Sequence, residues 1–206
     1  MLVVWGRKNS INVQKVLWCC DEMDVSYERR DAGGAFGVVN TPEYRRLNPN
    51  GLVPTIQDDG FALWESNAIV RYLARKHGHG SLCPAEPSRA ALAEQWMDWQ
   101  VSTLWPAIRP LFIGLVRTPA EQRDAAALEA SRQKTVEALR MLDAHLEKHA
   151  YVAGDAFSMG DIPVGATAWR WMALPIERVE LPHLQRWFED LAQRPVFAGV
   201  VMQPLT

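Results

Sequence analysis

The pattern of strand-like and helix-like segments changes once along the chain, and this change limits the possible fold more than any other feature. In the first 77 residues, short apolar runs bounded by turns alternate with segments whose apolar residues recur at helical spacing. After the glycines and prolines of residues 78–87, no segment has the pattern of a strand. The sequence therefore predicts a mixed α+β region followed by an all-helical region.

The first region has the order strand, helix, strand, helix, two strands and helix. The strands are expected at residues 2–5, 26–30, 53–57 and 61–63. The helices are expected at residues 12–23, from Thr41-Pro42 onward and at 65–77. Asp58-Asp59-Gly60 has the composition of a hairpin turn. This order predicts a four-stranded mixed sheet with helices packed against it, in a domain that spans residues 1–78.

A linker at residues 79–87 separates this domain from a helical domain that spans residues 88–206. One long helix is expected from Ser88 to about Val116, kinked at Pro106 because proline lacks the amide hydrogen that a helix uses. Further helices are expected at 118–149, after the capping box Ser158-Met159-Gly160-Asp161, and at 181–193.

Charge and cysteine content narrow the possible partners and the cellular location. The formal net charge is −2, so neither nucleic acid nor an anionic membrane is expected as a partner. The three cysteines show no metal-ligand spacing, and their odd number does not suit a disulfide framework. The N-terminal stretch reaches a charge too early for a signal peptide. We therefore expect a cytoplasmic protein.

Two rival chemistries fail on residue spacing. His145 and His149 lie four apart, but the segment reads His-Leu-Glu-Lys-His and no third ligand is evident, so no metal site is expected. Ser10 lacks the G-x-S-x-G setting of a hydrolase nucleophile.

Three separated motifs resemble those of the soluble glutathione transferases. The segments NPNGLVP (residues 48–54) and LWESNAIVRYL (63–73) are similar to that family's glutathione site, and FSMGDI (157–162) is similar to its N-capping box and hydrophobic staple. The resemblance covers the whole chain in order and spacing. It implies a thioredoxin-like N-terminal domain (βαβ-α-ββα) with an all-α C-terminal domain, glutathione as co-substrate, and a bacterial serine-type or nu-like member of the family.

The resemblance also implies how glutathione is held. Glu65 and Ser66 would bind the γ-glutamyl end at the start of a helix, where free N–H groups and the helix dipole favour a carboxylate. Val53 would pair its backbone with the glutathione cysteine, next to a cis peptide bond at Pro54. The alternative is that Glu65 and Ser66 only cap their helix.

The thiol of glutathione has to ionise before it can attack, because the thiolate is the nucleophile. Ser10 lies in the loop after the first strand, just ahead of a helix, so its hydroxyl could donate a hydrogen bond to the sulfur. Asn12 is a second candidate donor, because Ser-Ile-Asn is similar to the Thr-x-Asn of nu-class proteins. The alternative role for both residues is helix capping.

Two further assignments follow from the resemblance. Leu52 stands where many relatives carry a side chain that meets the glycine carboxylate of glutathione, so Asn40 or Arg7 would have to replace it. The pocket for a small hydrophobic electrophile would lie between the domains, and its expected residues are Arg7, Trp105, Ile108, Arg109 and Phe112.

Three functions are compatible with this sequence. Conjugation of glutathione to an electrophilic carbon is the first, and glutathione-dependent reduction of a disulfide or peroxide is the second. The third is a non-catalytic module that binds glutathione or a protein partner. The resemblance also implies a homodimer in which the N-terminal half of one subunit meets the Ala90–Gln100 helix of the other, which carries Trp96 and Trp99.

Overall fold

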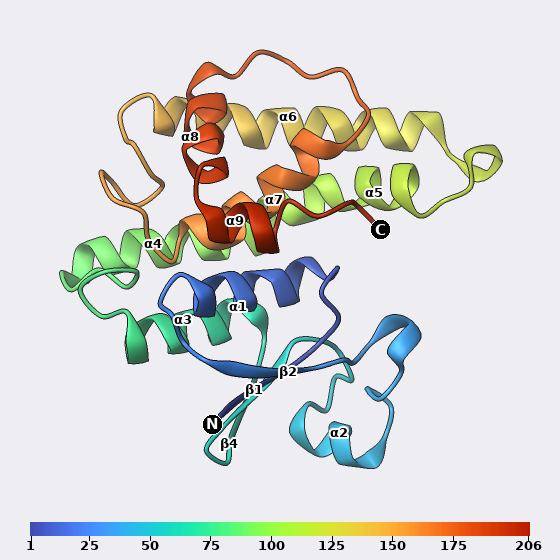
Figure 1. Cartoon of the computed structure of the whole chain (residues 1–206). Helices are drawn as coiled ribbons and strands as arrows, with labels where there is room; N and C mark the ends of the chain where they lie inside the picture. Colours follow the sequence, from blue (N-terminus) through green and yellow to red (C-terminus); the bar gives the residue numbers. More distant parts are fainter.

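The computed structural model describes residues 1–206, and it places a sheet domain beneath a stack of helices (Figure 1). The four strands run in the order β2-β1-β3-β4 across one sheet. The central strand β1 is parallel to β2 and antiparallel to β3, and β3 and β4 form an antiparallel hairpin. The strands are β1 (Leu2–Trp5), β2 (Tyr27–Arg30), β3 (Thr55–Asp58) and β4 (Phe61–Trp64). The predicted mixed sheet is confirmed.

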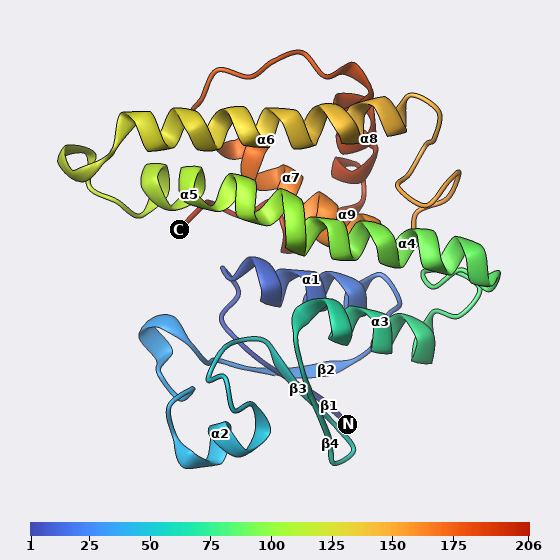
Figure 2. The same cartoon turned by 180° about the vertical axis from the view of Figure 1, so that it is seen from behind.

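Three helices belong to the sheet domain: α1 (Ile11–Asp21), α2 (Pro42–Leu47) and α3 (Ser66–His77). A 3-10 turn, η1 (Gly34–Phe36), lies between β2 and α2. Figures 1 and 2 show α1 and α3 between the sheet and the helical domain. The turn that leads from β1 into α1 passes very close to that helix at Gly6. A Cβ atom there would lie 2.3 Å from a methyl carbon of Val13, so only glycine fits and the turn can approach α1.

The second domain is all-helical, as predicted. Helices α5 and α6 lie side by side, and α7 packs against α1 in the interior (Figures 1 and 2). Almost every residue of α7 is buried, so this helix joins the cores of the two domains. The helices are α4 (Pro87–Trp99), α5 (Trp105–Val116), α6 (Ala125–Leu146), α7 (Asp161–Ala173), α8 (Pro182–Ala192) and α9 (Pro195–Val200).

The long helix expected over residues 88–116 is irregular at a different place from the prediction. A π-helical turn, η2 (Gln100–Leu104), joins α4 to α5 ahead of Pro106. The wider turn changes the hydrogen-bond register just before a residue that has no amide hydrogen. The sequence pattern located the proline but not the turn that accommodates it.

The predicted start of the next helix at Thr118 is wrong. The Thr118 hydroxyl donates to the carbonyl oxygen of Ile113 at 3.2 Å, and so it belongs to the end of α5. A 3-10 turn, η3 (Ala120–Gln122), follows. Asp124 caps α6 instead, because its carboxylate accepts a hydrogen bond from the amide of Ala127 at 3.0 Å. The short helix α9 was not predicted.

The capping box at the start of α7 is present in a modified form. The Asp161 carboxylate accepts hydrogen bonds from the amide and the hydroxyl of Ser158, at 2.9 and 3.1 Å. Its other oxygen accepts from the amide of Val152 and from the indole of Trp187. Burial raises the pKa of Asp161 to about 6, although these four hydrogen bonds act in the opposite direction. No helix combines the length and the apolar character needed to cross a membrane.

Candidate functional site

A cavity of about 370 Å³ lies between the two domains. Its floor comes from the turn after β1, the start of α1 and the loop before β3, and its other walls come from α5 and α7. The cavity brings together most of the residues predicted from the sequence: Arg7, Ser10, Asn12, Leu52, Val53, Trp105, Arg109 and Phe112. The two domains therefore build one site.

Ser10 is held at the N-terminal end of α1 by its backbone. Its amide donates to the carbonyl oxygen of Arg7 at 3.2 Å, and its own carbonyl accepts from the amide of Gln14 at 2.9 Å. The Ser10 side chain makes no capping hydrogen bond. This hydroxyl, which is nearly buried, thus lines the cavity without a partner from the chain.

Asn12 is linked to the start of α3. The hydroxyl of Ser66 donates a hydrogen bond to the Asn12 side-chain oxygen at 3.3 Å. Because the oxygen is used in this way, the amide nitrogen of Asn12 is left as a donor at the cavity wall. The capping alternative therefore describes neither Ser10 nor Asn12, whose side chains leave the first backbone amides of α1 unsatisfied.

The loop before β3 presents an unpaired stretch of backbone. The Val53–Pro54 peptide bond is cis, as the resemblance implies. Neither the amide nor the carbonyl of Val53 takes part in a backbone hydrogen bond. The preceding carbonyl of Leu52 is held firmly, since it accepts from the Tyr44 hydroxyl at 2.7 Å and from the Asn48 amide at 2.9 Å. Tyr44 and Asn48 thus fix the shape of a loop whose next residue is free to bind.

Glu65 and Ser66 lie at the start of α3. Glu65 has a φ angle of 71°, which is uncommon for a residue with a side chain. It is exposed, and it makes no side-chain hydrogen bond to the helix backbone. Since Ser66 donates to Asn12 instead, neither residue caps α3, and the first amides of this helix remain available.

Five predicted site residues are not among those that line the cavity. Pro54 follows Val53, and Glu65 and Ser66 lie at the start of α3, while Ile108 and Asn40 lie elsewhere. Ile108 is fully buried in the hydrophobic core and does not line the cavity, because it occupies the inward face of α5. The Asn40 side-chain oxygen accepts a hydrogen bond from Arg45 at 2.8 Å, and Asn40 also lies outside the cavity. Leu52 lines the cavity, but the residue is 64% exposed.

Sequence reasoning missed several lining residues, among them Asn9, Ile113, Arg117 and Arg170. Arg170 carried a usable signal, since it is a charged residue between Trp169 and Trp171 in a helix that is otherwise mostly apolar. Arg117 follows the last residue of α5, and nothing in its sequence context indicated a place in the site.

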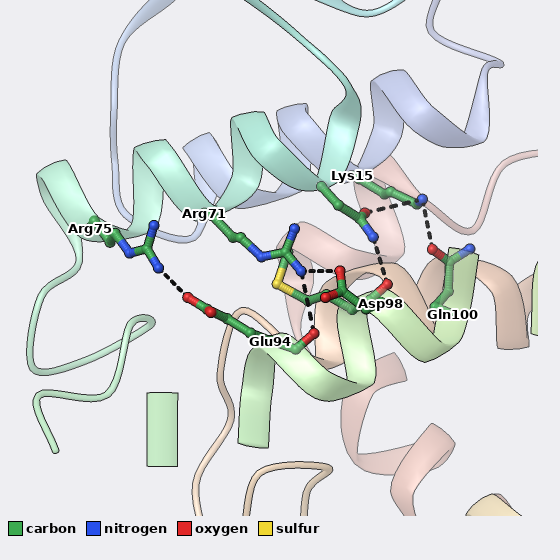
Figure 3. Close-up of polar contacts among 8 residues, drawn as sticks. Lys15, Arg71, Arg75, Glu94, Asp98 and Gln100 are labelled. Carbon is green, nitrogen blue, oxygen red and sulfur yellow. Dashed lines mark hydrogen bonds and ion pairs between the residues drawn. The ribbon is translucent and has the colours of Figure 1, made fainter. Parts of the chain in front are cut away.

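Polar contacts hold the helical domain over α1 and α3 (Figure 3). Arg71 and Arg75 of α3 form ion pairs with Asp98 and Glu94 of α4. The ammonium group of the buried Lys15 donates to Gln100 at 3.0 Å, and it also contacts the side-chain oxygen of Asn67 at 3.4 Å. Burial lowers the pKa of Lys15 to about 7. These contacts join α4 and η2 to α1 and α3.

The protein joins a thioredoxin-like sheet domain to an all-helical domain and has a polar cavity between them. These features define the class of two-domain proteins to which it belongs. The family model "Glutathione S-transferase, N-terminal domain" matches residues 9–76, and "Glutathione S-transferase, C-terminal domain" matches residues 103–195. The chain belongs to the glutathione S-transferase family.

Individual relatives agree with this assignment. Glutathione S-transferase GstB of Escherichia coli is 43% identical over 208 residues, with both chains covered completely. A crystal structure of a theta class glutathione S-transferase from Xanthomonas axonopodis pv. citri, with glutathione bound, superposes with a TM-score of 0.96 at 49% identity. The superposition covers 100% of this chain and 99% of the Xanthomonas chain. A delta-class enzyme from Nilaparvata lugens has a TM-score of 0.87 at 27% identity, over 97% of this chain and 92% of that one.

Proposed function

We propose that this glutathione S-transferase activates the thiolate of glutathione for attack on an electrophilic carbon held in the interdomain cavity, with Ser10 as the main donor to the sulfur. The observation that carries the proposal is the Ser10 hydroxyl, which lines the cavity at the N-terminus of α1 and has no partner from the chain. The relative from Xanthomonas supports it, because its structure contains bound glutathione.

The chemistry needs a lower thiol pKa. A free cysteine thiol has a pKa of about 8.5 and is mostly protonated at neutral pH. A hydrogen bond from Ser10 and the positive end of the α1 dipole both favour the thiolate. The thiolate then attacks the electrophilic carbon, a carbon–sulfur bond forms, and the leaving group departs with its electron pair. Asn12 is the second donor, which leaves the serine-type and nu-like mechanisms to be separated by experiment.

The remainder of glutathione would bind the first domain. Val53 offers its unpaired backbone groups to the cysteine residue of glutathione, as an added strand would require. Glu65 and Ser66 would hold the γ-glutamyl end, because Glu65 supplies a counter-charge for its amine and the uncapped start of α3 supplies amides for its carboxylate. With Asn40 engaged elsewhere, Arg7 is the candidate for the glycine carboxylate.

The assembly and location of the protein are proposals as well. We propose a homodimer, supported by exposed apolar side chains on both expected contact surfaces: Leu92 and Val101 near α4, and Phe61 and Trp64 on β4. Trp96 does not contribute, because it is buried against His145. A cytoplasmic location is supported by three free cysteines. Domain boundaries at 1–78, 79–87 and 88–206 are supported by α3, which ends at His77, and by α4, which begins at Pro87.

Three assays on the purified protein test the proposed activity. Steady-state rates with 1-chloro-2,4-dinitrobenzene measure conjugation, rates with a small disulfide measure reduction, and calorimetric titration measures glutathione binding. Conjugation that falls in Ser10→Ala supports the proposal. Turnover of the disulfide alone would favour the reductase, and glutathione binding without thiolate formation would favour a non-catalytic module.

A further inference from the structure

The interdomain cavity carries a concentration of positive charge. Four arginines line it: Arg7 after β1, Arg109 and Arg117 on α5 and at its end, and Arg170 on α7. No aspartate or glutamate lines the cavity. None of these four arginines forms an ion pair with an aspartate or a glutamate. Arg117 donates two hydrogen bonds to the backbone oxygen of Thr206, at 3.1 and 2.8 Å.

Arg170 is the most unusual member of this arginine cluster, because it is buried. Arg170 is only 3% exposed. One terminal nitrogen donates to the carbonyl oxygen of Ala166 at 2.8 Å and the other donates to the side-chain oxygen of Gln14 at 2.6 Å, while Nε has no partner. Both partners are neutral. A buried cation normally needs an opposite charge, and none is present here.

Three members of the cluster, Arg7, Arg117 and Arg170, act on one another electrostatically. Burial, together with the charge of Arg117, lowers the pKa of Arg170 to about 9. The pKa of Arg7 is also lowered, again by burial and by Arg117. These guanidinium groups therefore repel one another, and an anion placed among them would relieve the repulsion and gain charge-assisted hydrogen bonds.

Part of the remaining wall is apolar, although Asn9, Ser10 and Asn12 also line the cavity. Trp105 and Phe112 pack with their ring centroids 6.2 Å apart, and Ile113 lies beside them. A ligand that fits this cavity thus combines a carbon skeleton with an anionic group. Of glutathione's two carboxylates, the γ-glutamyl one is assigned to the start of α3 and the glycine one to Arg7, which leaves Arg109, Arg117 and Arg170 for the anion of a second ligand.

We propose that the second substrate is an anionic electrophile, in which a carboxylate or a similar planar anion binds the arginine cluster and the apolar wall holds the carbon that glutathione attacks. The inference rests on the proposed function, and it adds an anionic group to the small hydrophobic electrophile expected from the sequence. Arg109, Arg117 and Arg170 come from the helical domain, so the anion would lie across the cavity from Val53 and the sulfur.

A matched pair of aryl halides tests the inference directly. With 4-chloro-3,5-dinitrobenzoate, the thiolate forms a carbon–sulfur bond at C4, the carbon–chlorine bond breaks and chloride leaves, while the carboxylate is unchanged. With 4-chloro-3,5-dinitrobenzamide, the same bonds change but the anion is absent. We expect kcat/KM, divided by the uncatalysed rate constant, to be at least about tenfold higher for the benzoate, as a hydrogen bond to a charged group predicts.

Variants connect that preference to the cluster. Arg117 is exposed, so Arg117→Gln should fold normally, and it should reduce the benzoate-to-benzamide ratio by about tenfold. Arg170→Gln should do the same where it folds, and Arg170→Lys should retain part of the ratio because the charge remains. Arg140→Gln removes an exposed arginine from α6 outside the cavity and should leave the ratio unchanged.

A binding experiment separates the second substrate from glutathione as the source of the anion. The protein is saturated with S-methylglutathione and titrated calorimetrically with 4-nitrobenzoate and 4-nitrobenzamide. Tighter binding of the benzoate to this complex, lost in Arg117→Gln, supports the inference. Loss of benzoate binding when S-methylglutathione is present would overturn it, because the arginines would then serve glutathione. Equal turnover of both aryl halides would also overturn it while leaving the proposed function intact, whereas no conjugation of either would reject the proposed function itself.

Discussion

The hydroxyl of Ser66 donates a hydrogen bond to the side chain of Asn12 at 3.3 Å, and this bond joins the N-terminus of α3 to the N-terminus of α1. One end of the bond belongs to the candidate γ-glutamyl site, and the other belongs to a candidate donor to the sulfur. A change at Asn12 should therefore disturb both parts of the glutathione site. Ser10 has no such link, so it can be tested alone.

Ser10→Ala should raise the pKa of the bound thiol. The change removes one hydroxyl donor and no bulk, so we expect the fold and the affinity for glutathione to survive. Losing a charge-assisted hydrogen bond of about 1.5–3 kcal/mol should raise the pKa of the glutathione thiol by about one to two units. Turnover at neutral pH should fall roughly ten- to a hundredfold and recover in part at alkaline pH. The measurement is thiolate absorbance against pH with glutathione bound.

Asn12→Ala is the matched control for that titration. Because Asn12 also holds Ser66, its replacement should weaken glutathione binding, which Ser10→Ala should not do. If Asn12→Ala shifts the thiol pKa and Ser10→Ala leaves it unmoved, Asn12 is the main donor and the nu-like mechanism replaces the serine-type one. If neither variant moves the titration, the activating group lies elsewhere.

Glu65→Ala should weaken glutathione binding without changing the ionisation of the bound thiol, because Glu65 would act at the γ-glutamyl end, away from the sulfur. Since its side chain does not cap α3, the change should cost less than about 1 kcal/mol of unfolding free energy. Calorimetric titration together with thermal melting checks both points. Unchanged affinity would refute the assignment. Glu137→Ala, at an exposed position on α6, controls for the loss of a charge.

The sheet domain could be predicted because its signals are local. The hairpin turn illustrates this point: Asp59 and Gly60 both have positive φ angles, which is the backbone geometry that the Asp-Gly pair favours. Likewise, the pattern of residues 65–77 predicts an amphipathic helix without any knowledge of its neighbours, and α3 begins one residue later. Such elements are specified over a few residues.

The site could be predicted only in part, because it depends on contacts between distant segments. Nothing near Arg170 in the sequence shows that Gln14 will meet it across the domain boundary. The same holds for Asn12 and Ser66, whose hydrogen bond appears only when α1 and α3 are packed together. The sequence assigns Ile108 to the cavity because helical spacing places it near residues that do line it. The orientation of α5 turns Ile108 toward the core instead, and this orientation is set by packing against distant segments.

Asp161→Ala should destabilise the protein severely. The buried carboxylate accepts four hydrogen bonds, from Ser158 (two), Val152 and Trp187, and the change leaves these donors without an acceptor. We expect the unfolding free energy to fall by about 3–5 kcal/mol. Asp161→Asn retains one oxygen and should lose less. Denaturant unfolding measures both variants against Asp155→Ala, an exposed position. A loss in Asp161→Ala as small as that in Asp155→Ala would contradict this role.

The protein should be a dimer in solution at micromolar concentration. Light scattering should give twice the 23.2 kDa of one chain. Leu92 is 43% exposed on α4, and Leu92→Glu should shift the mass toward that of one chain because a charge would be buried at the interface. Met141 is comparably exposed on α6, outside the proposed interface, and Met141→Glu should leave the dimer intact. A mass of one chain for the unmodified protein would reject the dimer.

The last prediction concerns Lys15, a buried ammonium whose neighbours Gln100 and Asn67 are neutral. Its pKa in the folded protein is lowered to about 7, chiefly by burial and also by the positive charge of Arg170, while Glu65 acts in the opposite direction. In the unfolded chain the pKa returns to about 10.4. Below pH 7 both states carry the proton, and the cost of burying the charge is constant. Between about pH 7 and 10 the unfolded chain binds more protons than the folded one, so Lys15 makes stability rise with pH.

Lys15→Met should remove this dependence. The free energy of unfolding of the unmodified protein, minus that of Lys15→Met, should increase from pH 7 to pH 10 by up to about 1.4 kcal/mol per pH unit, because only the unmodified protein contains the titrating group. Denaturant unfolding at pH 6, 7.5 and 9 measures the difference, and between pH 6 and 7 it should stay nearly flat. Lys134→Met, at an exposed position on α6, should give a curve parallel to that of the unmodified protein. If the Lys15→Met curve is parallel as well, Lys15 stays charged when buried, and the hydrogen bonds that it donates to Gln100 and Asn67 are sufficient to hold that charge.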